Sequence, residues 1–185
     1  MIKNKINLLD CTLRDGGYYN NWFFERKLIN EYLRVMDMIK IDYVEIGFRF
    51  LDKVKTKGPF AYSEESFLRS LKIPKNLKIG VMVNASDFVG QKNIIELAKK
   101  NFKPKKNSVI SLVRLACHHH EVKDVLPLIN WLKKSGYKVG VNIMQIPELS
   151  SREIKNVVKE VKKTKADILY FADSMGSLDA IKTKK

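Results

Sequence analysis

The chain has 185 residues, of which 45% are hydrophobic and 30% charged, a composition typical of a globular protein that can bury the core of one domain. No stretch approaches the roughly 18 uninterrupted apolar residues of a membrane span, and the start MIKNKINLLD lacks the apolar segment of a secretory signal. We therefore expect a cytoplasmic protein without a membrane partner. Cys11 and Cys117 show no CxxC spacing, which predicts reduced thiols and excludes a disulfide framework.

The formal net charge is +15, and such an excess of basic residues is one mark of proteins that bind nucleic acids. The sequence contains neither an aromatic RNA-binding signature nor zinc-finger spacing. The lysines fall on the expected outer faces and ends of helices, which favours a solvated exterior and no nucleic-acid partner. The main lysine clusters are Lys99, Lys100, Lys103, Lys105 and Lys106, then Lys133 and Lys134, then Lys155, Lys159, Lys162, Lys163 and Lys165.

The first organised stretch is residues 6–20, INLLDCTLRDGGYYN. A short apolar run that ends in polar groups and two glycines predicts a buried strand, then a glycine turn, as at the sites of parallel α/β proteins. Arg14 and Asp15 are the candidate site residues of this stretch. Either Asp15 binds a divalent cation while Arg14 stabilises an oxyanion, or the two form a salt bridge in a loop.

Residues 25–40 have helical spacing and predict an outer helix, and residues 43–48 predict the second strand. The expected buried stripe of that helix is Leu28, Tyr32, Leu33, Met36 and Ile39. Glu45 lies inside the second strand, and a buried carboxylate needs a partner. Arg14 on the adjacent strand would satisfy it.

Residues 49–60 predict a long mobile loop that is able to act as a lid. A short helix over 63–71 with Ser63 as its N-cap, a third strand over 77–83, a helix over 89–100 and a fourth strand over 108–116 follow. Arg114, near the end of that fourth strand, either points into the mouth of a barrel or faces the helices.

Three consecutive histidines, His118, His119 and His120, come next. Adjacent side chains point in different directions in a strand or a helix, so at most two of them can readily share one metal ion. Two roles stay open: a loop that starts the next helix, or a substrate-side role for one histidine.

The rest of the chain repeats the pattern: a helix over 121–134 stopped by Ser135 and Gly136, a strand over 137–143, a helix to Lys163 and a strand over 167–171. Ser150 and Ser151 are both N-cap candidates for the second of these helices. The last strand ends in Asp173 and Ser174 before Gly176. This segment is either a second group of site residues or a plain capped turn.

The segments DCTLRDGGYYN, YVEIGF and YFADSMGSL together resemble the metal-dependent aldolase, lyase and acyl-transferase superfamily, which includes hydroxymethylglutaryl-CoA lyase and 4-hydroxy-2-oxovalerate aldolase. The resemblance implies an α/β fold, a (β/α)8 barrel, and chemistry on a 2-oxo or hydroxy acid. It also implies a divalent metal, Mn²⁺ or Mg²⁺, on Asp15, with Arg14 stabilising an enolate and Glu45 orienting Arg14. By the resemblance Ser174 would lie near the substrate carboxylate, Asp173 would support that part of the site, and Tyr18 stands where aldolases carry a basic histidine. We also count Arg114 as a substrate-binding candidate if it faces the barrel mouth.

The length conflicts with a whole barrel, because a (β/α)8 barrel typically needs about 250 residues. We expect one domain over residues 1–185 with six βα units and without strands seven and eight. The family's His-x-His metal ligands follow strand seven, so the metal would be weakly held. Two alternatives follow: an inactive fragment that serves at most as a binding module, and self-association through open sheet edges.

Overall fold

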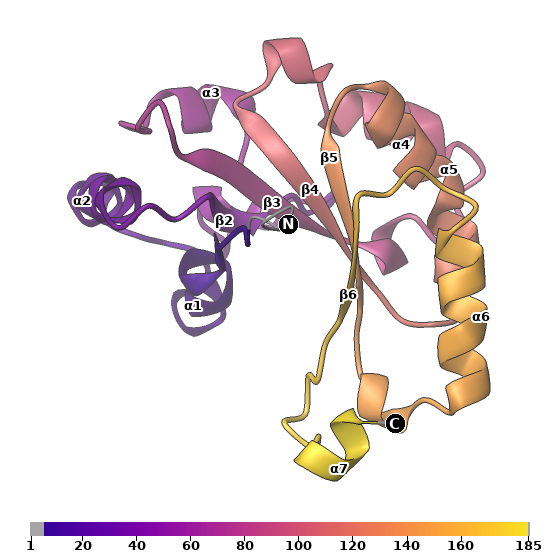
Figure 1. Cartoon of the computed structure of the whole chain (residues 1–185). Coiled ribbons are helices and arrows are strands. Elements are labelled where there is room, and N and C mark those ends of the chain that lie inside the picture. Colours follow the sequence, from indigo (N-terminus) through magenta and orange to yellow (C-terminus); the bar gives the residue numbers. More distant parts are fainter. Residues whose placement is uncertain (1–5, 185) are drawn as a thin grey trace, which may run out of the picture. The chain divides into compact units, whose positions relative to one another are not determined.

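The computed structural model describes residues 6–184, and it contains six strands that follow one another in the sheet in chain order (Figure 1). The described residues group into two compact units, one of residues 6–82 with 105–112 and the other of residues 83–104 with 113–184. The third and fourth strands each contribute residues to both units. The start MIKNKINLLD, on which the prediction of no secretory signal rests, lies partly outside the described residues.

The first unit contains the strands and helices of the DCTLRDGG and YVEIGF motifs. Its elements are β1 (Leu9–Asp10), α1 (Thr12–Asn20), α2 (Arg26–Met38), β2 (Tyr43–Phe48), α3 (Glu65–Arg69) and most of β3 (Lys78–Asn84). β2 pairs in parallel with both β1 and β3. All six residues of β2 are buried, as expected for a central strand of a parallel sheet.

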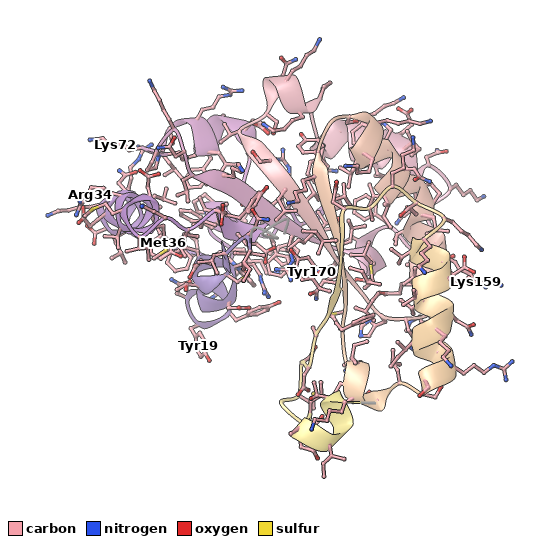
Figure 2. All side chains as sticks on the ribbon, in the orientation of Figure 1. Tyr19, Arg34, Met36, Lys72, Lys159 and Tyr170 are labelled. Atoms are coloured by element: carbon pink, nitrogen blue, oxygen red, sulfur yellow. The ribbon has the colours of Figure 1, made fainter. Side chains whose placement is uncertain are left out.

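The second unit contains the remaining βα repeats. Its elements are α4 (Ile94–Asn101), most of β4 (Ile110–Cys117), α5 (Val122–Lys134), β5 (Lys138–Ile143), α6 (Ser151–Val161), β6 (Ile168–Phe171) and α7 (Ala180–Thr183). β5 and β6 are parallel. Figure 2 shows Lys159 projecting outward from α6, whereas Tyr170 lies on the side of β6 away from that helix. The alternation of strands and helices predicted from the sequence is confirmed.

The glycine turn after the first strand was predicted wrongly. β1 is only Leu9–Asp10, and Gly16 and Gly17 lie inside helix α1. The second glycine is required by packing, because a Cβ at Gly17 would lie 2.0 Å from the indole of Trp22. Gly17 therefore allows the Trp22 ring to approach the helix backbone, and it does not form a turn.

Three helix details also differ from the prediction. In α2 the fully buried residues are Ile29 and Leu33, whereas Leu28 and Ile39 of the expected stripe are exposed, so the buried face is rotated. Ser63 does not cap α3: its hydroxyl donates to the carbonyl of Phe60, and α3 begins at Glu65. The helix expected to begin at residue 89 begins at Ile94, after a short 3-10 turn over residues 85–87 and after Gly90, whose positive φ of 72° is not helical.

Of the two N-cap candidates for α6, the structure selects Ser150. Its hydroxyl accepts the backbone N–H of Glu153, and the Glu153 carboxylate accepts the backbone N–H of Ser150, which is a complete capping box. We expect Ser150→Ala to lower the free energy of unfolding by about 1 kcal/mol. Ser151→Ala, the neighbouring substitution inside the helix, should change it by less than about 0.5 kcal/mol. Urea unfolding of both variants tests the assignment, which equal losses would contradict.

Within residues 6–184 no helix combines the length and the apolar character that crossing a bilayer would require. Both cysteines are free thiols. Burial, aided by the negative charge of Glu121, raises the pKa of the Cys117 thiol well above its ordinary value. That cysteine is therefore an inert core residue.

Candidate functional site

The first unit brings together the three residues that the sequence singled out at its start. Arg14 lies in the first turns of α1, and its Nε donates to Oε1 of Glu45 on β2 over 2.8 Å. Its Nη1 lies 2.6 Å from Oδ1 of Asp15. The Glu45 side chain is 0% exposed, that of Arg14 17% and that of Asp15 58%. The guanidinium thus joins a buried carboxylate to one that faces solvent.

The electrostatics of Arg14 follow from this position. Burial by itself would lower the pKa of the Arg14 guanidinium, but the charges of Glu45 and Asp15 outweigh it and raise the pKa. The cation is therefore permanent and held in one direction. Such a preorganised charge is suited to an oxyanion, because it needs little reorientation when negative charge develops.

Tyr18, one helical turn beyond Arg14, lies beside the same group. Burial raises the pKa of its phenol and Asp15 raises it further, although Arg14 opposes the shift. A phenol with a raised pKa stays protonated at neutral pH, so it can donate a hydrogen bond but serves poorly as a base. This environment does not supply the cationic activation that a basic tyrosine would need.

An aromatic cluster that the sequence reasoning missed holds Arg14 in place. The Trp22 indole N–H donates to the backbone carbonyl of Arg14 over 3.1 Å, and its ring meets those of Phe48 and Phe50 edge-on. The Arg14 guanidinium also lies over Phe48, 5.9 Å from the ring centre. The only sequence signal for this cluster is the density of aromatic residues in YYNNWFF and GFRF.

The expected lid loop, residues 49–60, contacts this cluster. Gly58 N–H donates to the carbonyl of Asn21 over 2.7 Å, and a Cβ at Gly58 would lie 2.3 Å from the Trp22 carbonyl oxygen. The Lys57 ammonium lies 4.1 Å from the centre of the Phe50 ring. The loop is thus fastened to the residues that follow α1, and a lid role requires these contacts to open.

Arg114 lies in the second unit, on β4. Its Nη2 donates to Oδ1 of Asn142 on β5 over 2.8 Å, and its guanidinium lies 4.5 Å from the centre of the Tyr170 ring on β6. Gly140 leaves room for these two side chains, because a Cβ there would lie 2.8 Å from the Tyr170 ring. Arg114 is therefore buried among residues of the neighbouring strands.

Asp173 and Ser174 follow β6. Asp173 accepts the backbone N–H groups of Leu178 and Ser177 over 2.7 and 3.0 Å, and these hydrogen bonds lower the pKa of its carboxyl. The Ser174 hydroxyl accepts the N–H of Gln145 over 3.3 Å. The contacts of Asp173 are those of a capped turn, whereas the contact of Ser174 joins this turn to the segment that follows β5.

The donors around Asp15 are a limited set for a metal ion. Within residues 6–184, Asp15 belongs to no cluster of three histidine, cysteine or carboxylate donors. Its oxygens suit a hard cation such as Mg²⁺ or Mn²⁺, but one carboxylate leaves most coordination positions to water and substrate. The chain's donors thus fit such an ion at low affinity.

Comparison with known proteins gives two curated relatives. The chain is 20% identical to the oxaloacetate decarboxylase of Mycobacterium tuberculosis over 172 residues, which are 92% of this chain and 48% of the relative. It is 26% identical to the 4-hydroxy-2-oxovalerate aldolase of Carboxydothermus hydrogenoformans over 177 residues, which are 94% of this chain and 50% of the relative. No protein-family model matches the chain.

Among solved structures, hydroxymethylglutaryl-CoA lyase from Pseudomonas aeruginosa superimposes with a TM-score of 0.67 at 14% identity, over 97% of this chain and 61% of that one. The chain is similar to members of the DRE-TIM metallolyase superfamily. Its fold class is confirmed as six βα units of a TIM barrel. The chain spans about half the length of the curated relatives that it matches.

Proposed function

We propose that this chain supplies the oxyanion-stabilising part of a divalent-metal-dependent aldolase or lyase that acts on a 2-oxo or hydroxy acid. The observation that carries the proposal is the ion pair of Arg14 with the fully buried Glu45, beside the exposed carboxylate of Asp15. Carbon–carbon cleavage of such acids, or decarboxylation, passes through an enolate, and stabilising that enolate lowers the barrier.

Each residue then has a defined task. Glu45 fixes the plane of the guanidinium, and Arg14 presents its N–H groups to the enolate oxygen of the substrate. Asp15 is the residue that would hold Mn²⁺ or Mg²⁺, and the ion when bound polarises the 2-oxo group. Tyr18, protonated at neutral pH, donates a hydrogen bond at the edge of this group. We retain Arg114, Asp173 and Ser174 as substrate-binding candidates.

The direct test is deuterium exchange at the methyl group of pyruvate, followed by NMR in D₂O with Mg²⁺ added. Arg14→Lys keeps the charge but loses the planar fork, so exchange should fall by about 100-fold while Mn²⁺ affinity changes little. Arg34→Lys, which alters an exposed pair with Glu31 on α2, is the matched control and should exchange at the parent rate. Equal exchange in Arg14→Lys and the parent would remove Arg14 from the mechanism.

A second candidate function is a binding module without turnover. It is favoured by the raised pKa of Tyr18 and by the position of Asp15, which among the described residues 6–184 lies outside any three-donor cluster. In that case pyruvate binds, as calorimetry would show, but exchange stays at the rate of buffer with Mg²⁺. Loss of pyruvate binding in Arg14→Lys would still place the ligand at this site.

Asp15→Asn tests the metal assignment. The substitution removes the formal negative charge of the proposed ligand, so calorimetry should show Mn²⁺ affinity lowered by about tenfold or more. Asp52→Asn, at an exposed carboxylate of the same unit, should leave the affinity unchanged. If Mn²⁺ binds Asp15→Asn as it binds the parent, Asp15 is not the ligand, and the histidines at 118–120 become the better candidates.

We also propose that the 185-residue chain associates with itself. β1 and β6 are the outermost strands of the sheet within residues 6–184, and exposed strand edges pair readily with other chains. Size-exclusion chromatography with light scattering should therefore report dimers or larger species at micromolar concentration. A monodisperse monomer that unfolds cooperatively would contradict this expectation.

A further inference from the structure

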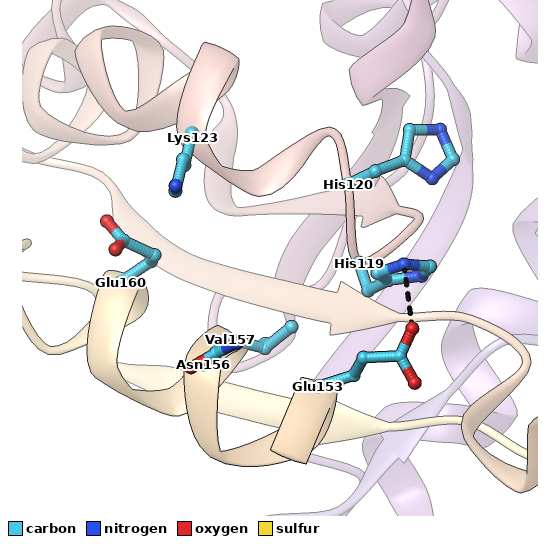
Figure 3. A pocket seen from close by; sticks show the side chains of 7 residues that line it. All are labelled: His119, His120, Lys123, Glu153, Asn156, Val157 and Glu160. Atoms are coloured by element: carbon cyan, nitrogen blue, oxygen red, sulfur yellow. Dashed lines mark ion pairs between the residues drawn. The ribbon is translucent and has the colours of Figure 1, made fainter. Parts of the chain in front are cut away.

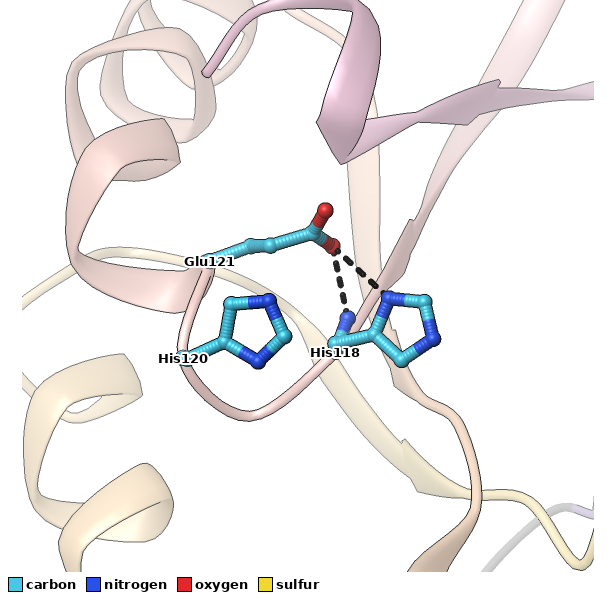
Figure 4. A group of neighbouring side chains, drawn as sticks. All are labelled: His118, His120 and Glu121. Atoms are coloured by element: carbon cyan, nitrogen blue, oxygen red, sulfur yellow. Dashed lines mark hydrogen bonds and ion pairs between the residues drawn. The ribbon is translucent and has the colours of Figure 1, made fainter. Parts of the chain in front are cut away.

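The turn between β4 and α5 carries a second cluster of metal-binding side chains, separate in sequence from Asp15. β4 ends at Cys117 and α5 begins at Val122, so His118, His119 and His120 lie in the turn between them. Donor atoms of His118, His120 and Glu121 lie within 4.8 Å of one another (Figure 4). The two imidazole rings stand side by side, 5.5 Å apart and nearly parallel.

The middle histidine contributes no donor atom to this group, although its ring centre lies 5.2 Å from that of His120, edge to face. His119 points toward α6, where its Nε2 lies 3.5 Å from Oε1 of Glu153 (Figure 3). There it lines, with His120, a cavity of about 210 Å³ between the start of α5 and α6. Two of the three histidines thus place donor atoms beside Glu121, which agrees with the expectation that at most two of them can share an ion. His119 becomes a natural control.

Glu121 is the preorganised member of the cluster. It is 7% exposed, and its Oε2 accepts the backbone N–H of His118 over 2.7 Å. The same oxygen lies 3.4 Å from Nδ1 of His118. Two ligands bonded to one tetrahedral ion at about 2.1 Å lie roughly 3.4 Å apart, so this pair already has the separation that a bound ion requires.

We propose that His118, His120 and Glu121 bind a borderline transition-metal ion of the Zn²⁺ class. Two imidazoles with one carboxylate suit Zn²⁺, Co²⁺ or Ni²⁺ and not the all-oxygen preference of Mg²⁺. His120 is exposed, and its ring can turn to close the cluster without disturbing the core. Three protein ligands leave a fourth position open, as in zinc sites that keep a bound water.

At the cluster the carboxylate of Glu121 favours a cation, whereas the N-terminus of α5 and the nearby ammonium of Lys123 oppose it. The N-terminus of α5 carries only about half an elementary positive charge, whereas ionised Glu121 contributes a full negative one. The alternative is a metal-free turn in which Glu121 accepts the His118 N–H and the two rings simply stack. The two descriptions differ in what each substitution does to metal affinity.

The test is a Zn²⁺ titration of the purified, tag-free chain after chelator treatment, read by calorimetry in competition with a chromophoric chelator. We expect binding of one ion, and His118→Gln and His120→Gln should each weaken it by about tenfold or more. His119→Gln should bind Zn²⁺ within about twofold of the parent, because that ring faces Glu153. Co²⁺ should give visible absorption bands in the parent and in His119→Gln that are lost in His120→Gln.

Two further measurements separate this site from the Asp15 site and from misfolding. Asp15→Asn should leave Zn²⁺ affinity unchanged, so failure of the proposed enolate chemistry does not affect the result. Circular dichroism of each metal-free variant checks folding, and His120→Gln is decisive because its side chain is exposed. Absence of Zn²⁺ binding in the parent, or an equal loss in His119→Gln and His120→Gln, would overturn the proposal.

Discussion

Replacing Glu45 with glutamine should lower the free energy of unfolding by about 3 kcal/mol. The substitution keeps the shape but removes the charge from a fully buried side chain whose Oε1 receives the Arg14 Nε–H. Of the two ion pairs of the Arg14 guanidinium, the one with the more exposed carboxylate of Asp15 then remains. Breaking a buried ion pair on one side leaves an uncompensated charge, which is why the loss is large. Urea unfolding followed by circular dichroism measures it.

The double variant Arg14→Gln with Glu45→Gln shows whether the loss comes from the pair. Because both charges are gone, the double variant should lose roughly 1 to 2 kcal/mol less free energy of unfolding than the two single variants lose in sum. Glu31→Gln, in the exposed pair with Arg34, should leave the stability unchanged within error. Additive losses would mean that Glu45 and Arg14 stabilise the fold independently and that Glu45 does not orient the guanidinium.

The two neighbouring glycines of α1 should respond in opposite directions to alanine. Gly17→Ala places a methyl group 2.0 Å from the Trp22 indole, which is 3% exposed and enclosed by Phe48 and Phe50. Because that ring has no room to move, we expect a loss of about 2 to 3 kcal/mol. The nearest atom to a Cβ at Gly16 is 3.7 Å away, an ordinary contact.

Gly16→Ala should therefore stabilise the protein by about 0.5 to 1 kcal/mol, the helix-propensity difference between the two residues. Thermal and urea unfolding of the two variants, compared at the same pH, give the difference. If Gly17→Ala were as stable as Gly16→Ala, the packing of Trp22 against α1 would be wrong. The hydrogen bond from the Trp22 indole to the backbone carbonyl of Arg14 would then be wrong as well.

The sequence by itself determined the order of the elements. Alternating apolar runs and helical stripes reflect local periodicity, and they located β2 to the residue and β4, β5 and β6 to within two residues at each end. It also determined the pairing of Arg14 with Glu45, because a carboxylate inside an apolar strand requires a counter-charge. The sequence also narrowed the N-cap of α6 to Ser150 or Ser151, and the structure selects Ser150.

Only the tertiary structure decided what depends on groups distant in the chain. Gly16 and Gly17 read as a turn, yet they are helical, and glycine is needed at position 17 because the Trp22 ring lies against the backbone there. The buried face of α2 is centred on Ile29 and Leu33 because the packing partner, and not the helical period alone, selects among adjacent apolar residues. The two histidines beside Glu121 likewise became a candidate metal site through the path of the turn, which sends His119 to Glu153 and leaves His118 and His120 together.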